Sequence, residues 1–174
     1  MSKMIIRKAR LEDARAIATI HVRAWQAAYR DIVPSAFLNE LSIDQREDLW
    51  HQRLARVGNA TLFLAEEDEE VLGWAGVGPS RDTDAGTTTG ELYALYVSPR
   101  YWRHGVGRRL QSEGLEHLRD AGFTELTLWV LRANSNARTF YESVGFFIDV
   151  GIDKTVTIGG ADLLEVRLRR QIGG

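Results

Sequence analysis

The stretch from Glu91 to Leu110, ELYALYVSPRYWRHGVGRRL, joins a strand-like run directly to a helix-like run. Glu91 to Val97 is rich in aromatic and aliphatic residues, which is typical of a buried strand, and Pro99 ends its ladder of hydrogen bonds. A helix is then predicted from near Gly105 to Gly122. One face of this helix carries the small or apolar residues Val106, Leu110, Gly114 and Leu118. Such a unit predicts an α/β fold, in which the helix packs on a sheet.

The turn before this helix predicts an anion site. The free N–H groups of a helix N-terminus carry partial positive charge and attract anions. Gly105 and Gly107 leave room for a ligand to approach the backbone, while Arg103, Arg108 and Arg109 add charges suited to phosphate. The pattern favours a diphosphate on the first turn, although a helix start that only packs closely on the sheet has the same pattern.

Two other phosphate-binding motifs do not match this turn. A Walker P-loop requires G-x-x-x-x-G-K-[ST], and the chain has no such segment. The dinucleotide fingerprint requires a third glycine at the position where Leu110 stands. These mismatches disfavour an unrelated nucleotide-binding protein.

The rest of the chain has the patterns of further strands and helices. A helix is expected from Asp13, a second from the capping box at Ser42 to about Val57, and a third, short one after Asn134 or Asn136. Gly78 to Gly90 reads as an exposed loop. Strands are expected at Met4–Lys8, Thr61–Ala65, Glu70–Val77, Glu91–Val97 and Thr124–Leu131, and as two runs between Phe147 and Leu168 joined at Gly159-Gly160. The predicted fold is α/β, with a mixed, mostly antiparallel central sheet of about seven strands flanked by helices on both faces.

Length and composition predict one domain, residues 1–174, with an ordinary globular balance of 44% hydrophobic and 26% charged residues. The formal net charge of −2 argues against a nucleic-acid partner. The absence of cysteine excludes disulfides and thiolate metal sites, and no metal is expected. No apolar run has the length of a membrane span, and the N-terminus has no signal-peptide core. We therefore expect a cytoplasmic protein without a membrane partner.

Three segments resemble the GNAT superfamily of acetyl-CoA-dependent N-acetyltransferases. ELYALYVSPRYWRHGVGRRL is similar to the family's strand, turn and pyrophosphate loop, [QR]-x-x-G-x-[GA]. LTLWVLRANSNARTFYESVGF is similar to its next strand, a following Asn and the helix with A-x-x-x-Y-E-x-x-G-F, and IRKARLEDARAIATIHV is similar to its opening strand and helix. The resemblance implies a GNAT-like fold with a cofactor-binding core at residues 91–146. The chain departs from the loop pattern, because Trp102 stands at the family's Gln or Arg and Arg103 at a small neighbour.

The resemblance implies acetyl-CoA as cosubstrate. The backbone of the turn would hold its diphosphate, and the backbone of Tyr96 and Val97 would pair with the pantetheine arm and offer an N–H to the thioester carbonyl. Asn134 occupies a cofactor-contacting family position, and it is equally suited to be a plain helix cap. The implied turn residues are Arg103, His104, Gly105, Val106, Gly107 and Arg108.

Two residues are candidate catalysts. Glu91 lies six residues before Val97, the spacing of the glutamate base in histone-acetylating relatives, and the alternative is a solvated carboxylate at a strand end. Tyr141 matches the family tyrosine that protonates or hydrogen-bonds the leaving thiolate, and the alternative is a core aromatic residue. Without cysteine, direct attack in a ternary complex is simpler than a covalent intermediate, although an acyl-serine stays open.

Trp25 and Tyr29 lie one turn apart in the region that lines the acceptor pocket in this family, although most aromatic residues at this spacing belong to a core. His21 on the same face reads as a satisfied core histidine. We expect a small-molecule or peptide amine as acceptor, and a homodimer is expected only from family habit. Polyamine, amino acid, aminoglycoside and peptide N-terminus all stay open, as does a non-catalytic sensor that binds acetyl-CoA.

Overall fold

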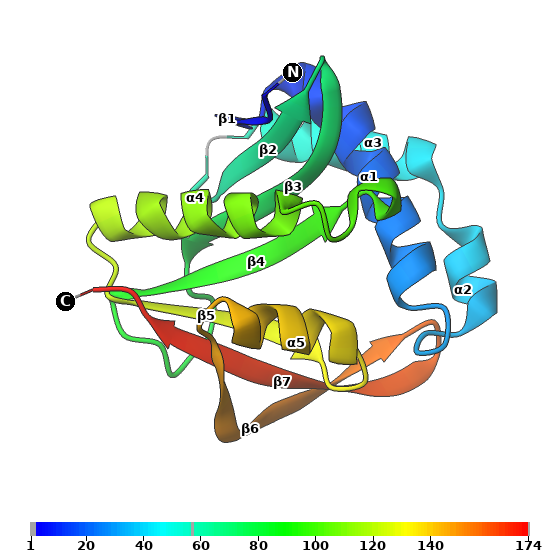
Figure 1. The fold of residues 1–174 in the computed structure, drawn as a ribbon. Coiled ribbons are helices and arrows are strands. Elements are labelled where there is room, and N and C mark those ends of the chain that lie inside the picture. The colour runs from blue at the N-terminus through cyan, green and yellow to red at the C-terminus, as the bar shows by residue number, and fades with distance from the viewer. Residues whose placement is uncertain (1–2, 57, 174) are drawn as a thin grey trace.

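The computed structural model describes residues 3–56 and 58–173, and all its strands lie in one sheet (Figure 1). The strands are β1 (Ile5–Lys8), β2 (Thr61–Glu67), β3 (Glu70–Pro79), β4 (Thr89–Val97), β5 (Glu125–Leu131), β6 (Phe147–Ile158) and β7 (Ala161–Gln171). Their order in the sheet is β1-β2-β3-β4-β5-β7-β6, and the β4–β5 pair is parallel while the other neighbours are antiparallel. The predicted mixed, mostly antiparallel seven-stranded sheet is therefore confirmed.

Helices cover both faces of the sheet, as expected (Figure 1). The helices are α1 (Ala14–Ala28), α2 (Ser35–Glu40), α3 (Ile43–Leu54), α4 (Val106–Asp120) and α5 (Ser135–Ser143), with short 3-10 turns η1 (Leu11–Asp13) and η2 (Pro99–Tyr101). α4 and α5 lie on one face, and α1 and α3 lie on the other. Within the described residues, no helix is both long and apolar enough to cross a membrane.

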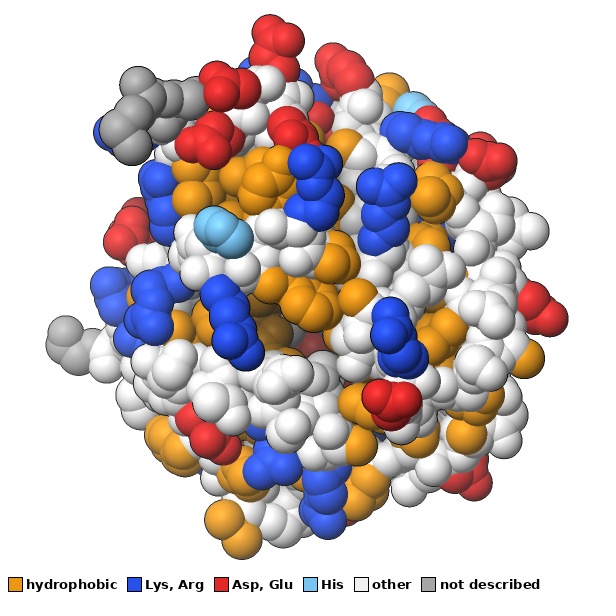
Figure 2. Space-filling view, turned by 45° about the vertical axis from the view of Figure 1, so that its right-hand side comes forward, with side chains coloured by type: hydrophobic (Ala, Val, Ile, Leu, Met, Phe, Trp, Pro, Cys, Tyr) orange, Lys and Arg blue, Asp and Glu red, His pale blue; other side chains and the backbone are white. Residues whose placement is uncertain are grey.

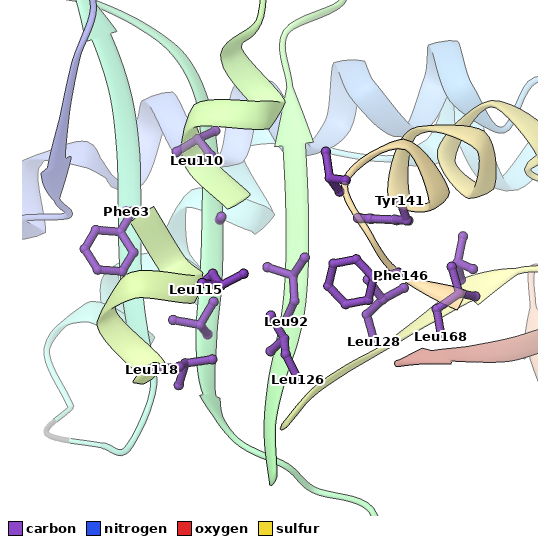
Figure 3. Close-up of a cluster of buried hydrophobic side chains, with 14 of the residues drawn as sticks. Phe63, Leu92, Leu110, Leu115, Leu118, Leu126, Leu128, Tyr141, Phe146 and Leu168 are labelled. Atoms are coloured by element: carbon purple, nitrogen blue, oxygen red, sulfur yellow. The ribbon is translucent and has the colours of Figure 1, made fainter. Parts of the chain in front are cut away.

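The larger part of the core lies between the sheet and the pair α4 and α5 (Figure 3). Leu110 and Leu118 of α4 are fully buried, as their helical spacing predicts. Gly114 lies between them on the same face, and a Cβ at this position would stand 2.8 Å from a methyl group of Val77. A glycine here lets α4 approach β3 closely.

One helix and the bounds of two other segments differ from the sequence predictions. α2 was not predicted, because a six-residue helix after Pro34 depends on packing, here of the buried Leu38, rather than on local propensity. α3 ends at Leu54, whereas its predicted end, Val57, lies outside the described residues. The predicted loop from Gly78 to Gly90 is wrong at both ends, since both glycines are buried strand residues and the loop spans only residues 80–88.

A β-bulge in β4 sets the geometry of everything that follows. Leu92 pairs with Val77 and Ala94 pairs with Gly76, so Tyr93 is an extra residue on β4. One inserted residue turns the side chains of all later strand residues to the opposite face of the sheet. It also turns their backbone N–H and C=O groups toward the opposite neighbouring strand. Leu95 therefore lies on the α4 face, where it packs with the core under α4, while Tyr96 lies on the α1 face.

Candidate active site

The sheet opens between β4 and β5. These strands pair through three residues each, Thr89–Glu91 with Glu125–Thr127, and β5 continues to Leu131 with β7 alone as its partner. Figure 1 shows the two strands together at one end and diverging toward the other. Figure 2 views the molecule from the side of this divergence and shows a hollow edged by hydrophobic and basic side chains.

The bulge directs backbone groups of β4 into this opening. The N–H of Ser98 donates to Leu72 O at 2.8 Å, and Tyr96 O lies 2.8 Å from the position of a Cβ on Gly73, so both residues turn their polar groups toward β3. Antiparallel ladders alternate, so the backbone groups of Leu95 and Val97 face the opposite side, the opening. The indole N–H of Trp102 donates to Val97 O at 2.8 Å, which leaves the Val97 N–H and the Leu95 groups for another partner.

The N-terminus of α4 lies uncapped beside the opening. Its N-cap, Gly105, has a left-handed φ of 82° and offers no side chain to the first turn, whereas Ser42 caps α3 and Asn134 caps α5. A Cβ on Gly105 would meet nothing within 4 Å, so the approach to these N–H groups is open. Arg103, His104 and Arg108 around this turn are exposed. Open N–H groups and nearby cations fit a diphosphate.

Gly107 faces the gap between α4 and α5. A Cβ on Gly107 would stand 3.4 Å from the Phe140 ring and 3.6 Å from Leu95, which are ordinary contacts. Val106 beside it is buried in the core under α4. A larger side chain at Gly107 would therefore project into the passage from the α4 turn to β4.

Three phenols converge at the open end: Tyr29 after α1, Tyr96 on β4 and Tyr141 on α5. Burial raises the pKa of all three, and neighbouring Tyr96 adds to the increase at Tyr29 and Tyr141. Raised pKa values keep all three hydroxyls protonated near neutral pH. Tyr29 and Tyr96 are half-buried.

The aromatic side chains around these phenols include unpaired donors. The rings of Trp25 and Tyr29 have centroids 4.9 Å apart, and the Trp25 indole N–H is buried without a hydrogen-bond partner among the described residues. His21 stacks on Tyr96 at 5.0 Å, and burial, with Arg46 and Arg53 nearby, lowers the pKa of His21 to about 4. His21 is a core residue as predicted, but it is not satisfied, since its Nδ1 atom also has no partner in the described chain.

Glu91 lies at the closed end of the opening, where β4 still pairs with β5. Its side chain is 2% exposed, so it is not a solvated carboxylate. Arg81 from the loop 80–88 donates three hydrogen bonds to it, from the backbone N–H at 2.9 Å, from Nε at 3.1 Å and from Nη2 at 2.6 Å. The guanidinium of Arg81 also lies over the Tyr93 ring, 4.4 Å from its centroid. Two of these bonds go to Oε2 and one goes to Oε1, which leaves one acceptor position on Oε1.

Comparison with known proteins identifies the family. The acetyltransferase (GNAT) family matches residues 22–146. The uncharacterized N-acetyltransferase YuaI of Bacillus subtilis (strain 168) is 36% identical over 139 residues, which cover 79% of this chain and 77% of the relative. The chain belongs to the GNAT acetyltransferase family. Like its relatives, it is an acyltransferase enzyme.

A second relative by sequence and one solved structure are also similar to this chain. The probable N-acetyltransferase Rv2775 of Mycobacterium tuberculosis (strain ATCC 25618 / H37Rv) is 30% identical over 150 residues, or 85% of this chain and 82% of the relative. The crystal structure of the PaiA N-acetyltransferase from Thermoplasma acidophilum in complex with coenzyme A has a TM-score of 0.74 at 21% identity. It covers 97% of this chain and 99% of that chain, and shows that the two share a fold.

The GNAT structure brings most of the predicted site residues to one opening, with two differences in detail. The backbone of Tyr96 points away from the opening, and its hydroxyl points toward the other phenols. The backbone of Leu95, which the sequence did not predict, therefore lines the opening together with that of Val97. Asn134 accepts a hydrogen bond from the Ala137 N–H at 3.2 Å and is a helix cap, one of its two predicted roles. Within the described part of the chain, no group of three or more His, Asp or Glu side chains is arranged to hold a metal ion.

Two functional candidates were missed by sequence reasoning. Arg81 lies in a loop that pattern analysis treats as an exposed connection, and Glu165 lies on β7, inside a run with no motif. No signal in the local sequence distinguishes them from other surface charges. Their roles depend on strand register, which places Arg81 beside Glu91 and Glu165 opposite Leu131.

Proposed function

We propose that this GNAT enzyme transfers the acetyl group of acetyl-CoA to a primary amine by direct attack in a ternary complex. The observation that carries the proposal is the opening between β4 and β5, which connects the uncapped turn of α4 to the three phenols. The related fold of the Thermoplasma protein, crystallised with coenzyme A, supports this assignment of the cosubstrate.

The α4 turn is proposed to bind the diphosphate. The N–H groups of residues 105–108 would donate to its oxygens, and the exposed Arg103, His104 and Arg108 would add charge. The pantetheine arm would then lie beside β4 like an added strand, with Val97 and Leu95 as its backbone partners. A Val97 N–H in this position would also polarise the thioester carbonyl. Asn134 would contact the arm from the end of β5.

Tyr141 is proposed to protonate the departing thiolate. In the reaction the amine nitrogen forms a bond to the acetyl carbon, the carbon–sulfur bond breaks, and the sulfur receives a proton while the nitrogen loses one. Burial, with Tyr96 nearby, raises the pKa of Tyr141, so its hydroxyl carries a proton throughout the neutral range. The raised pKa also makes this phenol a weaker acid than a free tyrosine, so its hydroxyl would assist the departing thiolate mainly by donating a hydrogen bond.

Glu91 is proposed as the base that removes the amine proton, directly or through water. It lies on the α1 face, which it shares with Tyr96 because of the bulge, and not on the face that binds α4. Its hydrogen bonds from Arg81 also favour a second candidate function, a sensor that holds acetyl-CoA without turnover. Trp25 and Tyr29 are proposed to line the acceptor side.

The two candidates are separated by one experiment in two stages. Binding of acetyl-CoA is measured by thermal shift, with ATP as control, and a ligand at about 100 times its dissociation constant stabilises by about 2.7 kcal/mol. Release of free CoA is then followed with a panel of amines. Binding with amine-dependent release supports the transferase, binding without it supports the sensor, and no binding contradicts both. The single domain, the cytoplasmic location and the homodimer stay predictions.

A further inference from the structure

Glu165 is a second carboxylate on the acceptor face of the sheet, and it lies at the open end. It pairs with Leu131, the last residue of β5, and its side chain is 21% exposed. Its ion partner is Lys154 on β6, whose Nζ lies 3.6 Å from Oε2, and that lysine is 45% exposed. Such a long, solvated contact is weak. Glu91, in contrast, accepts three hydrogen bonds and is fully buried.

The alternation of β7 directs Glu165 toward the phenols. Val166 and Leu168 belong to the core under α4 and α5, so Glu165 and Leu163 point to the other face, where Leu163 packs in the same cluster as Tyr29. Burial raises the pKa of both Tyr29 and Tyr96, and the negative charge of Glu165 adds a smaller increase, which agrees with a carboxylate on this face of the sheet.

An apolar cavity adjoins Glu165. It has a volume of about 370 Å³ and lies between the loop after α1, the end of β5 and β7. Its walls are Ile32, Leu131, Arg132, Ala133, Leu163 and Leu164. Two of these residues precede Glu165 in the chain, and Leu131 is its cross-strand partner. The cavity is half open to solvent, and its apolar walls suit an aromatic or branched aliphatic group.

We propose that Glu165 binds the ammonium group of the acceptor while the adjacent cavity holds its apolar substituent. The acceptor is then a primary amine carrying one aromatic or branched aliphatic group, and not a polyamine or an aminoglycoside. This inference rests on the proposed acetyl transfer. Tyr29 and Tyr96 complete the ammonium site as neutral oxygen acceptors. Lys154, whose Nζ also lies 3.9 Å from the centroid of the Trp129 ring, is the internal cation that the substrate replaces at Glu165.

Two single substitutions break the same ion pair and have opposite expected effects. Glu165→Gln removes the charge that binds the ammonium group and raises KM for phenethylamine about 10- to 100-fold, the range for a hydrogen bond to a charged group. Lys154→Met removes the competitor and lowers that KM by up to about 5-fold, the value of a solvated ion pair. If the pair were only structural, both variants would shift KM in the same direction or leave it unchanged, and either result would overturn the proposal.

The acceptor preference is tested on wild-type enzyme with saturating acetyl-CoA. We expect phenethylamine and isoamylamine to have a kcat/KM at least about 10-fold above spermidine and kanamycin, because a cavity that accepts a ring or branched group favours it by 1–3 kcal/mol. A preference for spermidine or kanamycin would overturn the inference. Calorimetric titration of the same amines into the CoA-bound protein tests it even without turnover, and failure of all of them to bind would also overturn it. Loss of acetyl-CoA binding, in contrast, would contradict the proposed function itself.

Discussion

The two ends of the opening between β4 and β5 differ in how completely their polar groups are paired. At the closed end, Glu91 is buried and accepts three hydrogen bonds from Arg81, and the Thr127 hydroxyl donates to Gly90 O at 3.2 Å. At the open end, Trp25 and His21 each have an unpaired ring nitrogen within the described chain. Buried polar groups are normally paired, but elsewhere in the described chain Gln111 of α4 and Arg138 of α5 also have unpaired nitrogens, so these atoms alone do not locate a ligand.

The polar contacts at the closed end hold the fold together, whereas the polar groups at the open end are free to bind a substrate. The loop 80–88 is attached to the sheet at the closed end, where Trp129 and Arg167 both bind Asp82 and Arg167 also binds Asp84. These contacts hold the strands together and leave little freedom. The open end has half-buried phenols and a weakly paired carboxylate, so it can accept a substrate without breaking strong internal interactions.

The largest effect is expected at the passage into the open end. Gly107→Asp places a carboxylate between Phe140 and Leu95, beside the proposed diphosphate, and should abolish acetyl-CoA binding in calorimetry. The Cβ itself makes ordinary contacts there, so the fold should survive. Gly107→Ala is the matched control and should retain binding in part. Unchanged affinity of a folded Gly107→Asp protein would remove the diphosphate from this turn.

The closed end is tested by Glu91→Gln. If Glu91 is the base, kcat/KM should fall about 10²- to 10⁴-fold near neutral pH while acetyl-CoA binding persists. The defect should shrink as pH rises, and for acceptors of lower pKa, because more of the amine then arrives neutral. The measurement is a pH profile of kcat/KM from pH 6 to 9.

Arg81→Met decides what the Glu91 result means. A base becomes more accessible when its partner is removed, so turnover per folded molecule should persist in Arg81→Met. If Glu91 only anchors the loop, both substitutions should lower activity together. In either case Arg81→Met leaves a buried carboxylate with fewer partners, and we expect it to destabilise the protein by about 3 kcal/mol in chemical denaturation.

Acid sensitivity is expected to come in part from the open end. Burial, followed by Arg46 and Arg53, lowers the pKa of His21 to about 4, below its ordinary value of 6.5. As pH falls, His21 therefore takes up a proton in the unfolded chain before it does so in the folded protein. The contribution of neutral His21 to the free energy of unfolding is complete above pH 6.5 and is lost as pH falls from 6.5 toward 4. The loss amounts to about 3 kcal/mol. Chemical denaturation at a series of pH values should show less acid destabilisation for His21→Phe than for the wild-type protein.

The smallest of these effects concerns a single hydroxyl at the open end. Tyr141→Phe keeps the ring that packs on Phe140 and Phe146, so stability and acetyl-CoA affinity should be retained. If the hydroxyl protonates the thiolate, kcat should fall about 10²-fold. Phe140→Leu changes the neighbouring packing without touching the hydroxyl and serves as control. An unchanged kcat, with chemistry rate-limiting, would leave Tyr141 as a packing residue.

Several features of the fold were correctly predicted because they depend on neighbours in the chain. Residue types at fixed spacing predicted three of them: the strand from Glu91, the turn at Gly105 and the buried helix face with Leu110 and Leu118. The resemblance to the GNAT family, drawn from the same segments, led to the correct fold and class of enzyme. Tyr141 was placed correctly as a buried residue, since its helix shows the same periodicity.

The sequence by itself therefore determined the elements, their order and the turn of α4, because helix period, capping and glycine conformations act over a few residues. Tertiary structure alone decided which side chains meet at the opening. The extra residue Tyr93 reverses the side-chain directions of the residues after it on β4, and Arg81 reaches Glu91 from a loop. Glu165 lies at the open end only because β7 pairs with β5. Strand register and a bulge are set by packing over the whole sheet, and a one-residue shift exchanges the faces, so no local pattern could have specified them.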